Sequence, residues 1–375
     1  MQGFAPFVPR LYWTPHVITN GWDDKDMNRR VFLGTLGLAG VGATLAASLR
    51  RRTVRKGTAD SGVSGTVSAV SGARRARVVS VRRPEVFSDG GGPDVRKLGI
   101  DSTVVRQMVR ESVIALAATK TSEGAWKKLF TSKDVVGIKV NCLGGRMFSS
   151  HPSIVDAIID GLREAGVRDE NIIVWDRFSR ELKAAGFPIH VTGKGVKYLG
   201  TDERGYGYTS EPIMHRSIGS CFSVILASKC TAIVSVPLLK DHDIAGVSIN
   251  LKNFFGAIQK PSLYHDNNCD PYIADLNGHP LIKEKNRLVI CDALLGVYDG
   301  GPAYNPDGAW KYGGILASTD PVALDGVAAA IIEAQRHNAG KPSLREAGRE
   351  PAYIHTAAQL GLGCDDPDKI AMVEV

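Results

Sequence analysis

The sequence contains six cysteines but lacks any C-x-x-C pair. Zinc ribbons and ferredoxin-type clusters hold their metal through closely spaced cysteines. The spacing therefore excludes both kinds of site, and no iron–sulfur cluster is expected. The cysteines stand singly, as Cys142, Cys221, Cys230, Cys269, Cys291 and Cys364. Such scattered cysteines are typical of buried small hydrophobic residues, although their even number also permits disulfides.

The main part of the chain, residues 84–375, also lacks an excess of basic residues, although the formal net charge of the whole sequence is +7. Residues 50–83 carry +9 and residues 1–49 carry +1, which leaves −3 for residues 84–375. A nucleic acid needs clustered basic side chains on the folded surface itself. The charge distribution therefore argues against nucleic acid as a partner and assigns the basic excess to a leader and a linker.

Residues 28–33 read N-R-R-V-F-L, and an apolar run interrupted by glycines continues to Leu49. The paired Arg29 and Arg30 and the moderate hydrophobicity of the run resemble a twin-arginine translocation signal. This resemblance implies the twin-arginine export machinery as a partner and a periplasmic or extracytoplasmic location. It also implies a folded cargo that takes up its cofactor before export.

Residues 27–49 are therefore predicted to be the signal, and residues 1–26 an upstream extension before the start at Met27. Ala46-Ala47-Ser48 offers a cleavage site. The alternative is an uncleaved leader that anchors the protein, and in either case the leader makes the only membrane contact. Residues 50–75 are basic and rich in Ser, Gly and Thr, which is typical of a flexible linker.

From Ala76 onward, strand and helix patterns alternate along the chain. The predicted strands are Arg77–Arg82, Val135–Val140, Ile172–Trp175, Ala232–Val236, Arg287–Cys291 and Gly313–Ala317; the predicted helices are Ser102–Ala118, Pro152–Ala165 and Val322–Gln335. Strand–helix–strand succession favours parallel pairs with a site at their carboxyl ends. We therefore expect an α/β fold of two Rossmann-like lobes, residues 76–214 and 215–375, with mainly parallel sheets and a cleft between them.

The segment Val236–Gly256 follows a buried strand and concentrates polar side chains. A histidine flanked by carboxylates, such as His242, suits a metal ligand or a general base. Lys252 stands beside two phenylalanines, and an apolar setting favours a lowered amine pKa or covalent attachment. The alternative for the whole segment is a polar loop with a helix cap, and the spacing alone leaves both interpretations open.

Three aspartates elsewhere have simpler interpretations. Asp320 precedes Pro321 and is predicted to cap a helix. Asp325, one turn later, is expected to have a structural role, and the alternative is that it reaches the site. The stretch Asp299–Pro302 is a turn first and a ligand loop second.

The body, over about residues 76–375, resembles the domain of unknown function 362 family. The matching segments are Val136–Asn141, His151–Ala157, Val236–Gly256, Asp299–Pro302 and Ser318–Val327. The long central segment and the last segment are the specific ones. The family resemblance carries no assigned reaction.

The central segment is also distantly similar to nickel-dependent lactate racemases, which carry P-H-x-x-A-G-x-S-G-G-x-K. The corresponding residues here are His242, Ala245, Gly246, Ser248 and Lys252, with His265 in the approximate place of a second ligating histidine. This resemblance implies a metal, nickel or another, at His242 and His265. It also implies a nucleotide-derived cofactor attached to Lys252.

These observations predict one cleft with a small-molecule ligand. Its expected catalytic residues are His242, Lys252 and His151, and its expected cofactor-binding residues are Lys139, Asn141, Lys240, Asn253 and His265. The alternative for His151 is a capping or packing role at a helix start.

The expected function is that of a cofactor- or metal-dependent enzyme, a racemase, epimerase or oxidoreductase. It would transfer a proton or hydride at a small oxygenated substrate. The alternatives are a redox accessory protein and a non-catalytic protein that binds a small anion.

Overall fold

The structure is a computed structural model that describes residues 76–88, 99–146 and 148–375. The predicted leader and linker, residues 1–75, lie outside the described residues. Among the described helices, none is both long enough and apolar enough to cross a membrane.

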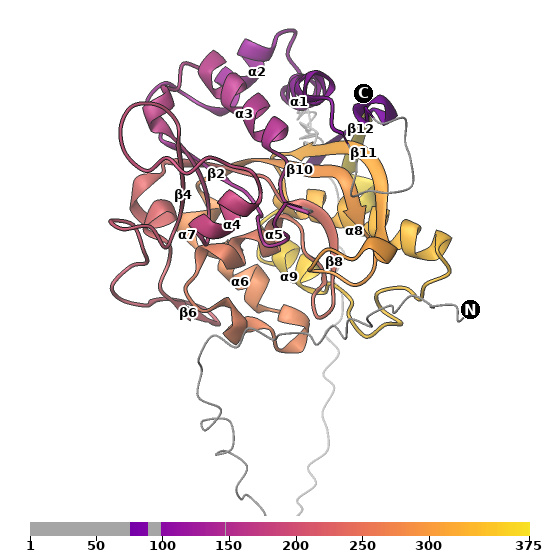
Figure 1. Cartoon of the computed structure of the whole chain (residues 1–375). Coiled ribbons are helices and arrows are strands. Elements are labelled where there is room, and N and C mark those ends of the chain that lie inside the picture. Colours follow the sequence, from indigo (N-terminus) through magenta and orange to yellow (C-terminus); the bar gives the residue numbers. More distant parts are fainter. Residues whose placement is uncertain (1–75, 89–98, 147) are drawn as a thin grey trace, which may run out of the picture. The chain divides into compact units, whose positions relative to one another are not determined.

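A ten-stranded sheet forms the centre of the described chain (Figure 1). Its strands follow the order β12 (Ile370–Glu374), β1 (Ala76–Arg82), β11 (Ala309–Ser318), β10 (Asn286–Val297), β7 (Ala232–Ser235), β2 (Val136–Lys139), β3 (Ile172–Asp176) and β4 (Lys197–Gly200). β8 (Leu238–His242) pairs with β10 and with β9 (Gly246–Val247). From β10 to β4 every pair is parallel, whereas β11 is antiparallel to both of its neighbours. The predicted α/β class with a mainly parallel sheet is confirmed.

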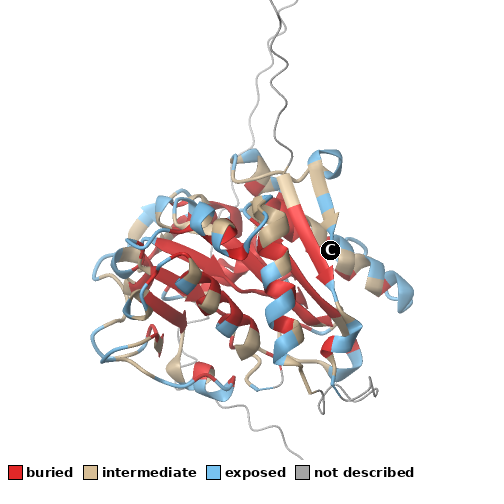
Figure 2. Cartoon of the chain, turned by 90° about the horizontal axis from the view of Figure 1, so that it is seen from above, coloured by how far each residue is buried: buried red, intermediate tan, exposed pale blue. Residues whose placement is uncertain are grey.

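Helices cover both faces of this sheet. They are α1 (Ser102–Ala117), α2 (Ser122–Leu129), α3 (Pro152–Glu164), α4 (Ser179–Ala184), α5 (Asn250–Asn253), α6 (Tyr272–Gly278), α7 (Pro280–Lys283), α8 (Pro321–Asn338) and α9 (Tyr353–Gln359); a separate small sheet pairs β5 (Ile213–His215) with β6 (Ile218–Ser220). In β3, Ile172 and Val174 belong to the buried cluster that includes residues of α1, α2 and α3, whereas Ile173 and Trp175 belong to the cluster that includes residues of α6, α8 and α9. Burial on both faces explains why these strands read as continuous apolar runs (Figure 2).

The longer helices begin within one residue of the predicted positions. The side chains of Asp101, His151 and Asp320 accept hydrogen bonds from backbone N–H groups in the first turns of α1, α3 and α8. Proline follows directly in α3 and α8, where its missing N–H has no helical partner to lose. The capping role predicted for Asp320 is confirmed.

The division into two lobes is not confirmed. β7, from the predicted second lobe, pairs along its whole length with β2, from the first. Strands from both sides of residue 215 join one main sheet. Within the described residues, the predicted boundary near residue 215 therefore does not divide this sheet into two. The cleft expected between lobes is replaced by a site at one edge of this sheet.

Some strands are longer than their apolar runs, and others were not predicted. β10 and β11 extend beyond the predicted Arg287–Cys291 and Gly313–Ala317 because they pair with each other, and a backbone ladder needs no apolar side chain. β8 covers residues that the sequence suggested as a loop.

The six cysteines all lie in the described chain, none is disulfide-bonded, and four are buried.

Candidate functional site

Polar side chains gather at the carboxyl ends of β2, β3 and β8. Together with the segment around α5 they line a cavity of about 210 Å³. Of the eight residues predicted for the site, this cavity contains Lys139, Asn141, Lys240, His242, Lys252, Asn253 and His265. The carboxyl ends of neighbouring parallel strands meet at one edge of a sheet, which explains why residues so far apart in sequence converge here.

His151 is not brought to this cavity. It borders a separate cavity of about 620 Å³ together with the buried Asp292. Its Nδ1 accepts a hydrogen bond from the backbone N–H of Ser153 at 3.3 Å, and the backbone N–H of His151 donates to Asp292 Oδ2 at 2.8 Å. His151 thus performs the capping role that was its alternative interpretation, and the geometry separates it from the other predicted site residues.

Lys139 forms a buried ion pair with Asp176, the last residue of β3. Its Nζ lies 2.7 Å from Asp176 Oδ1 and also donates to Val140 O at 2.7 Å and Asn253 Oδ1 at 3.3 Å. The second carboxylate oxygen of Asp176 accepts from the N–H of Cys142 at 2.7 Å. The positive charge of Lys139 is therefore balanced within the protein by Asp176, and the paired lysine forms part of the cavity lining.

Lys240 is equally buried, with 1% of its surface exposed, but it has a different set of partners. Its Nζ donates to Asn141 Oδ1 at 3.0 Å and to Pro302 O at 3.3 Å, and neither acceptor carries a charge. Burial lowers the pKa of Lys240 to about 8, and repulsion from Lys252 and Lys139 adds to this while Asp176 opposes it. The lysine is a cation without a carboxylate bonded to it.

Lys252 projects from α5 into the same cavity. Its Nζ lies 3.1 Å from His265 Nε2 and 3.7 Å from Cys269 Sγ, and 4.1 Å from the centre of the Phe255 ring. Burial lowers its pKa to about 8, and burial raises the pKa of the Cys269 thiol. The apolar setting predicted for this amine from its neighbours in sequence is present.

Asp325 fixes the short helix that carries Lys252. Its two carboxylate oxygens accept hydrogen bonds from the backbone N–H groups of Asn250 at 2.9 Å and Leu251 at 3.0 Å. These are the first residues of α5, whose free N–H groups need acceptors. Asp325 therefore has the structural role that the sequence suggested, and through that role it positions Lys252.

The two histidines of the cavity have opposite hydrogen-bonding characters. His242 Nδ1 accepts from the backbone N–H groups of Ile244 at 3.1 Å and Ala245 at 3.3 Å, so the neutral ring carries its proton on Nε2. His265 Nδ1 lies 3.0 Å from Pro261 O and must donate to it, which leaves Nε2 as the acceptor for Lys252. His242 therefore offers a donor to a ligand, and His265 offers an acceptor.

His242 is uncharged in this setting. Burial, with the nearby charges of Lys252 and other cations, lowers its pKa to about 2. Asp243 Oδ1 also lies 2.9 Å from Nδ1. Because the ring carries no charge and Nδ1 already accepts two N–H groups, this contact is not an ion pair.

A metal ion bound by His242 and His265 does not suit these donors. A ligating histidine binds metal through an unprotonated nitrogen and donates from the other, whereas His242 accepts at Nδ1. The rings lie 5.7 Å apart, but His265 Nε2 is already engaged by Lys252. No group of three or more His, Cys, Asp or Glu side chains in the described part of the chain is placed to hold a metal ion.

A bulky cofactor is also a poor fit. Cavities that enclose drug-sized ligands measure roughly 300–1,000 Å³, whereas this one measures about 210 Å³. The space suits a molecule of a few heavy atoms rather than a nucleotide.

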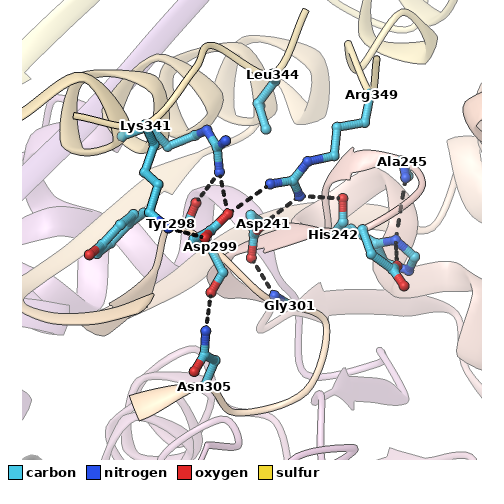
Figure 3. Close-up of polar contacts among 12 residues, drawn as sticks. Asp241, His242, Ala245, Tyr298, Asp299, Gly301, Asn305, Lys341, Leu344 and Arg349 are labelled. Carbon is cyan, nitrogen blue, oxygen red and sulfur yellow. Dashed lines mark hydrogen bonds and ion pairs between the residues drawn. The ribbon is translucent and has the colours of Figure 1, made fainter. Parts of the chain in front are cut away.

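Behind the cavity, a network of charged residues holds β8 in place (Figure 3). Arg349 donates to Asp241 Oδ2 at 2.7 Å and to His242 O at 2.9 Å, and its second nitrogen reaches Asp299 Oδ1 at 3.1 Å. Asp241 Oδ1 accepts from Gly301 N–H at 2.7 Å. The Asp299–Pro302 turn thus supports the site from outside, and its last carbonyl reaches Lys240.

Sequence reasoning missed Asp176 and Arg349. Asp176 stands at the carboxyl end of a predicted strand, and that position was the available signal. Arg349 lies 108 residues from Asp241 in the sequence, and no local pattern marks it.

The sequence model of one protein family, described as a domain of unknown function (DUF362), matches residues 136–330. This range includes the cavity residues from Lys139 to Pro302. No curated protein matches the chain.

Proposed function

The chain belongs to the DUF362 family, and we propose that it is an enzyme that binds a small organic carboxylate in the cavity at the ends of β2, β3 and β8. It transfers a proton at a carbon atom close to that carboxylate. The observation that carries this proposal is the burial of Lys240 and Lys252 in one cavity without a carboxylate bonded to either.

Burying an unpaired ammonium group is costly, because the charge loses its hydration and gains no counter-charge. Lys139, in the same cavity, avoids this cost through Asp176. Lys240 and Lys252 do not, and a bound carboxylate would supply the missing negative charge. The burial of these two amines without a counter-charge in the ligand-free protein therefore favours a binding site for an anion.

The remaining lining also favours an anion. The charged side chains of the cavity are four basic ones, Lys139, Arg177, Lys240 and Lys252, and two acidic ones, Asp176 and Glu181. Arg177 Nε is buried without a hydrogen-bond partner among the described residues. His242 Nε2 adds a neutral donor, and donors aimed at developing negative charge are what stabilises an oxyanion.

Lys252 is the residue suited to proton transfer. A lysine whose pKa lies near 8 exchanges its proton close to neutral pH, which an exposed lysine does not. His265 Nε2, 3.1 Å from Nζ, accepts from it in either protonation state. We assign Lys240 and His242 to binding and Lys252 to the chemistry.

Ligand-induced thermal stabilisation tests the binding step. Lactate, glycolate and pyruvate should raise the melting temperature of the full-chain protein, and uncharged lactamide should not. Lys240→Met should abolish the stabilisation, whereas Lys229→Met, at an exposed position away from the cavity, should retain it. Equal stabilisation of both variants would overturn the proposal.

Proton exchange tests the enzymatic step. Incubation of the protein with each carboxylate in D₂O should replace carbon-bound hydrogen at C2 of lactate or glycolate, or in the methyl group of pyruvate, as followed by NMR. Lys252→Met should lose this exchange. A wild-type protein that binds the carboxylates but exchanges none of them would be a non-catalytic anion-binding protein.

We further propose that the protein is exported through the twin-arginine route. The support is the N-R-R-V-F-L motif of residues 28–33 and the moderately apolar run that follows. Residues 76–375 are close to neutral, since Arg77, Arg82 and Arg83 offset the net −3 of residues 84–375, and this favours a small molecule over nucleic acid as ligand.

A further inference from the structure

Lys252 differs from the other buried lysines of the described chain in what surrounds its amine. Lys139 is paired with Asp176, and Lys240 donates to Asn141 Oδ1 and Pro302 O. The partly buried Lys285 likewise donates to two carbonyl oxygens, those of Leu226 at 2.6 Å and Ala227 at 3.3 Å. The Nζ of Lys252 instead contacts a histidine acceptor, a thiol and a phenyl ring. None of these holds the nitrogen permanently as an ammonium, so its lone pair can be released for bond formation.

The position of this amine is rigidly defined. It belongs to a helix whose first two N–H groups are held by the buried Asp325, and Lys252 itself is 5% exposed. A nucleophile needs such fixation, because a lysine side chain has many rotamers to lose on reaching one geometry. Lys252 lines the cavity, so a ligand bound there lies next to its side chain.

Lys240 supplies a second positively charged group that can bind a carboxylate. Lys240 lines the same small cavity, held by Asn141 and Pro302 O, and its charge and that of Lys252 repel each other. A molecule that carries a carboxylate next to a carbonyl group can place one on each lysine. Short 2-oxo acids combine these two groups within a few heavy atoms.

We propose that Lys252 condenses with the carbonyl carbon of a short 2-oxo acid to form a Schiff base, while Lys240 binds the acid's carboxylate. This inference rests on the proposed function and names its substrate class. It also supplies the reason that a proton close to the carboxylate can be moved. C2 of such an acid carries no hydrogen, but an iminium group at C2 withdraws electrons from the carbon–hydrogen bonds of the neighbouring C3.

The reaction balances without any further reagent. The nitrogen of Lys252 gives up a proton to His265 Nε2 and attacks the carbonyl carbon, whose oxygen then takes up two protons and leaves as water. Overall, an ammonium and a ketone become an iminium and one water, so the single positive charge stays on the nitrogen. His242 Nε2–H is a donor available to the oxygen while it carries negative charge.

Reductive trapping tests the proposal. The full-chain protein is incubated with pyruvate and sodium cyanoborohydride, and intact mass and peptide mapping locate any carboxyethyl group. We expect one adduct per chain, on Lys252. Lys252→Arg should remove it, whereas Lys285→Arg, which changes a partly buried lysine that does not line the cavity, should leave it unchanged.

Lactate separates this inference from the proposed function, because it has the carboxylate but no carbonyl. Both acids should stabilise the protein thermally, and pre-incubation with lactate should slow trapping by pyruvate. Stabilisation by both acids without an adduct on Lys252 would overturn the Schiff base and leave carboxylate binding intact. Absence of both stabilisation and adduct would overturn the proposed function as well.

Discussion

Lys139 and Asp176 meet at 2.7 Å across the carboxyl ends of the adjacent strands β2 and β3, and both are buried. The pair shows how a lysine is accommodated in this cavity when the protein itself provides the counter-charge. Lys240 and Lys252 lie in the same cavity with uncharged acceptors only. The predictions that follow depend on this difference.

Asp176→Asn should destabilise the protein strongly, because it leaves the charge of Lys139 buried and unpaired. Breaking one partner of a buried pair costs about 3–5 kcal/mol, to be measured by urea unfolding. Asp160→Asn is the control, since Asp160 pairs with arginines on the surface, and loss of such a pair costs under about 1 kcal/mol. Similar losses in both variants would contradict the assignment.

Lys240→Met should make the ligand-free protein more stable while abolishing its response to carboxylates. The substitution removes an uncompensated buried charge and keeps a similar volume, so we expect a gain of about 1–2 kcal/mol. Thermal unfolding with and without pyruvate measures both effects. A less stable variant with a normal ligand response would mean that Lys240 is structural.

Carboxylate affinity should fall as the pH rises through about 8. Lys240 must be protonated to attract the ligand, and its pKa is lowered to about 8 by burial, with Lys252 and Lys139 contributing and Asp176 opposing. The attraction is complete well below that pH and is lost above it, by about tenfold per pH unit for one charge. Calorimetric titration with pyruvate at several pH values checks this. An affinity that is constant up to about pH 10, where an ordinary lysine titrates, would contradict it.

Arg349→Met should weaken both stability and ligand binding, although Arg349 does not line the cavity. Its loss leaves the buried Asp241 without its cation and frees the backbone of His242. We expect destabilisation of about 3 kcal/mol and a several-fold higher Kd for pyruvate. Arg345 lies four residues before Arg349. Arg345→Met removes an exposed ion pair with Glu350 and should change neither quantity.

Replacement of both Arg29 and Arg30 by lysine should retain the protein in the cytoplasm, because the twin-arginine pathway reads the arginine pair. Fractionation of cells that express the wild-type and double-lysine chains provides the measurement. Normal amounts of the variant in the envelope fraction would show that the pair is not an export signal.

The sequence predicts much of the cavity because its chemistry is local. His242 and Lys252 stand in one motif, and Lys139 and Asn141 follow an apolar strand whose end faces a site in any parallel sheet. His151 also precedes a helix at such a position, but its Nδ1 is used by Ser153. Whether a histidine caps a helix or takes part in catalysis depends on which groups its ring nitrogens contact in the fold. The spacing of residues along the sequence does not determine those contacts.

Strand order and the supporting network are beyond sequence reasoning for a different reason. Apolar periodicity identifies β2, β3 and β7 as buried strands but does not say which of them pair. The joining of β7 to β2 is decided by packing across the whole sheet, and it removes the expected division into lobes. Arg349 reaches Asp241 through the same long-range arrangement.

The position of β1 has a consequence for the timing of folding. This strand, the first of the described chain, lies between β11 and β12, with Ala76 beside Ile370. During synthesis β1 leaves the ribosome long before β11 and β12 have been made. Its backbone N–H and C=O groups therefore cannot form their sheet hydrogen bonds with these strands until almost the entire chain has left the ribosome. A ribosome that stalls before Ile370 would release a protein with β1 at an open sheet edge, where it can pair with another copy.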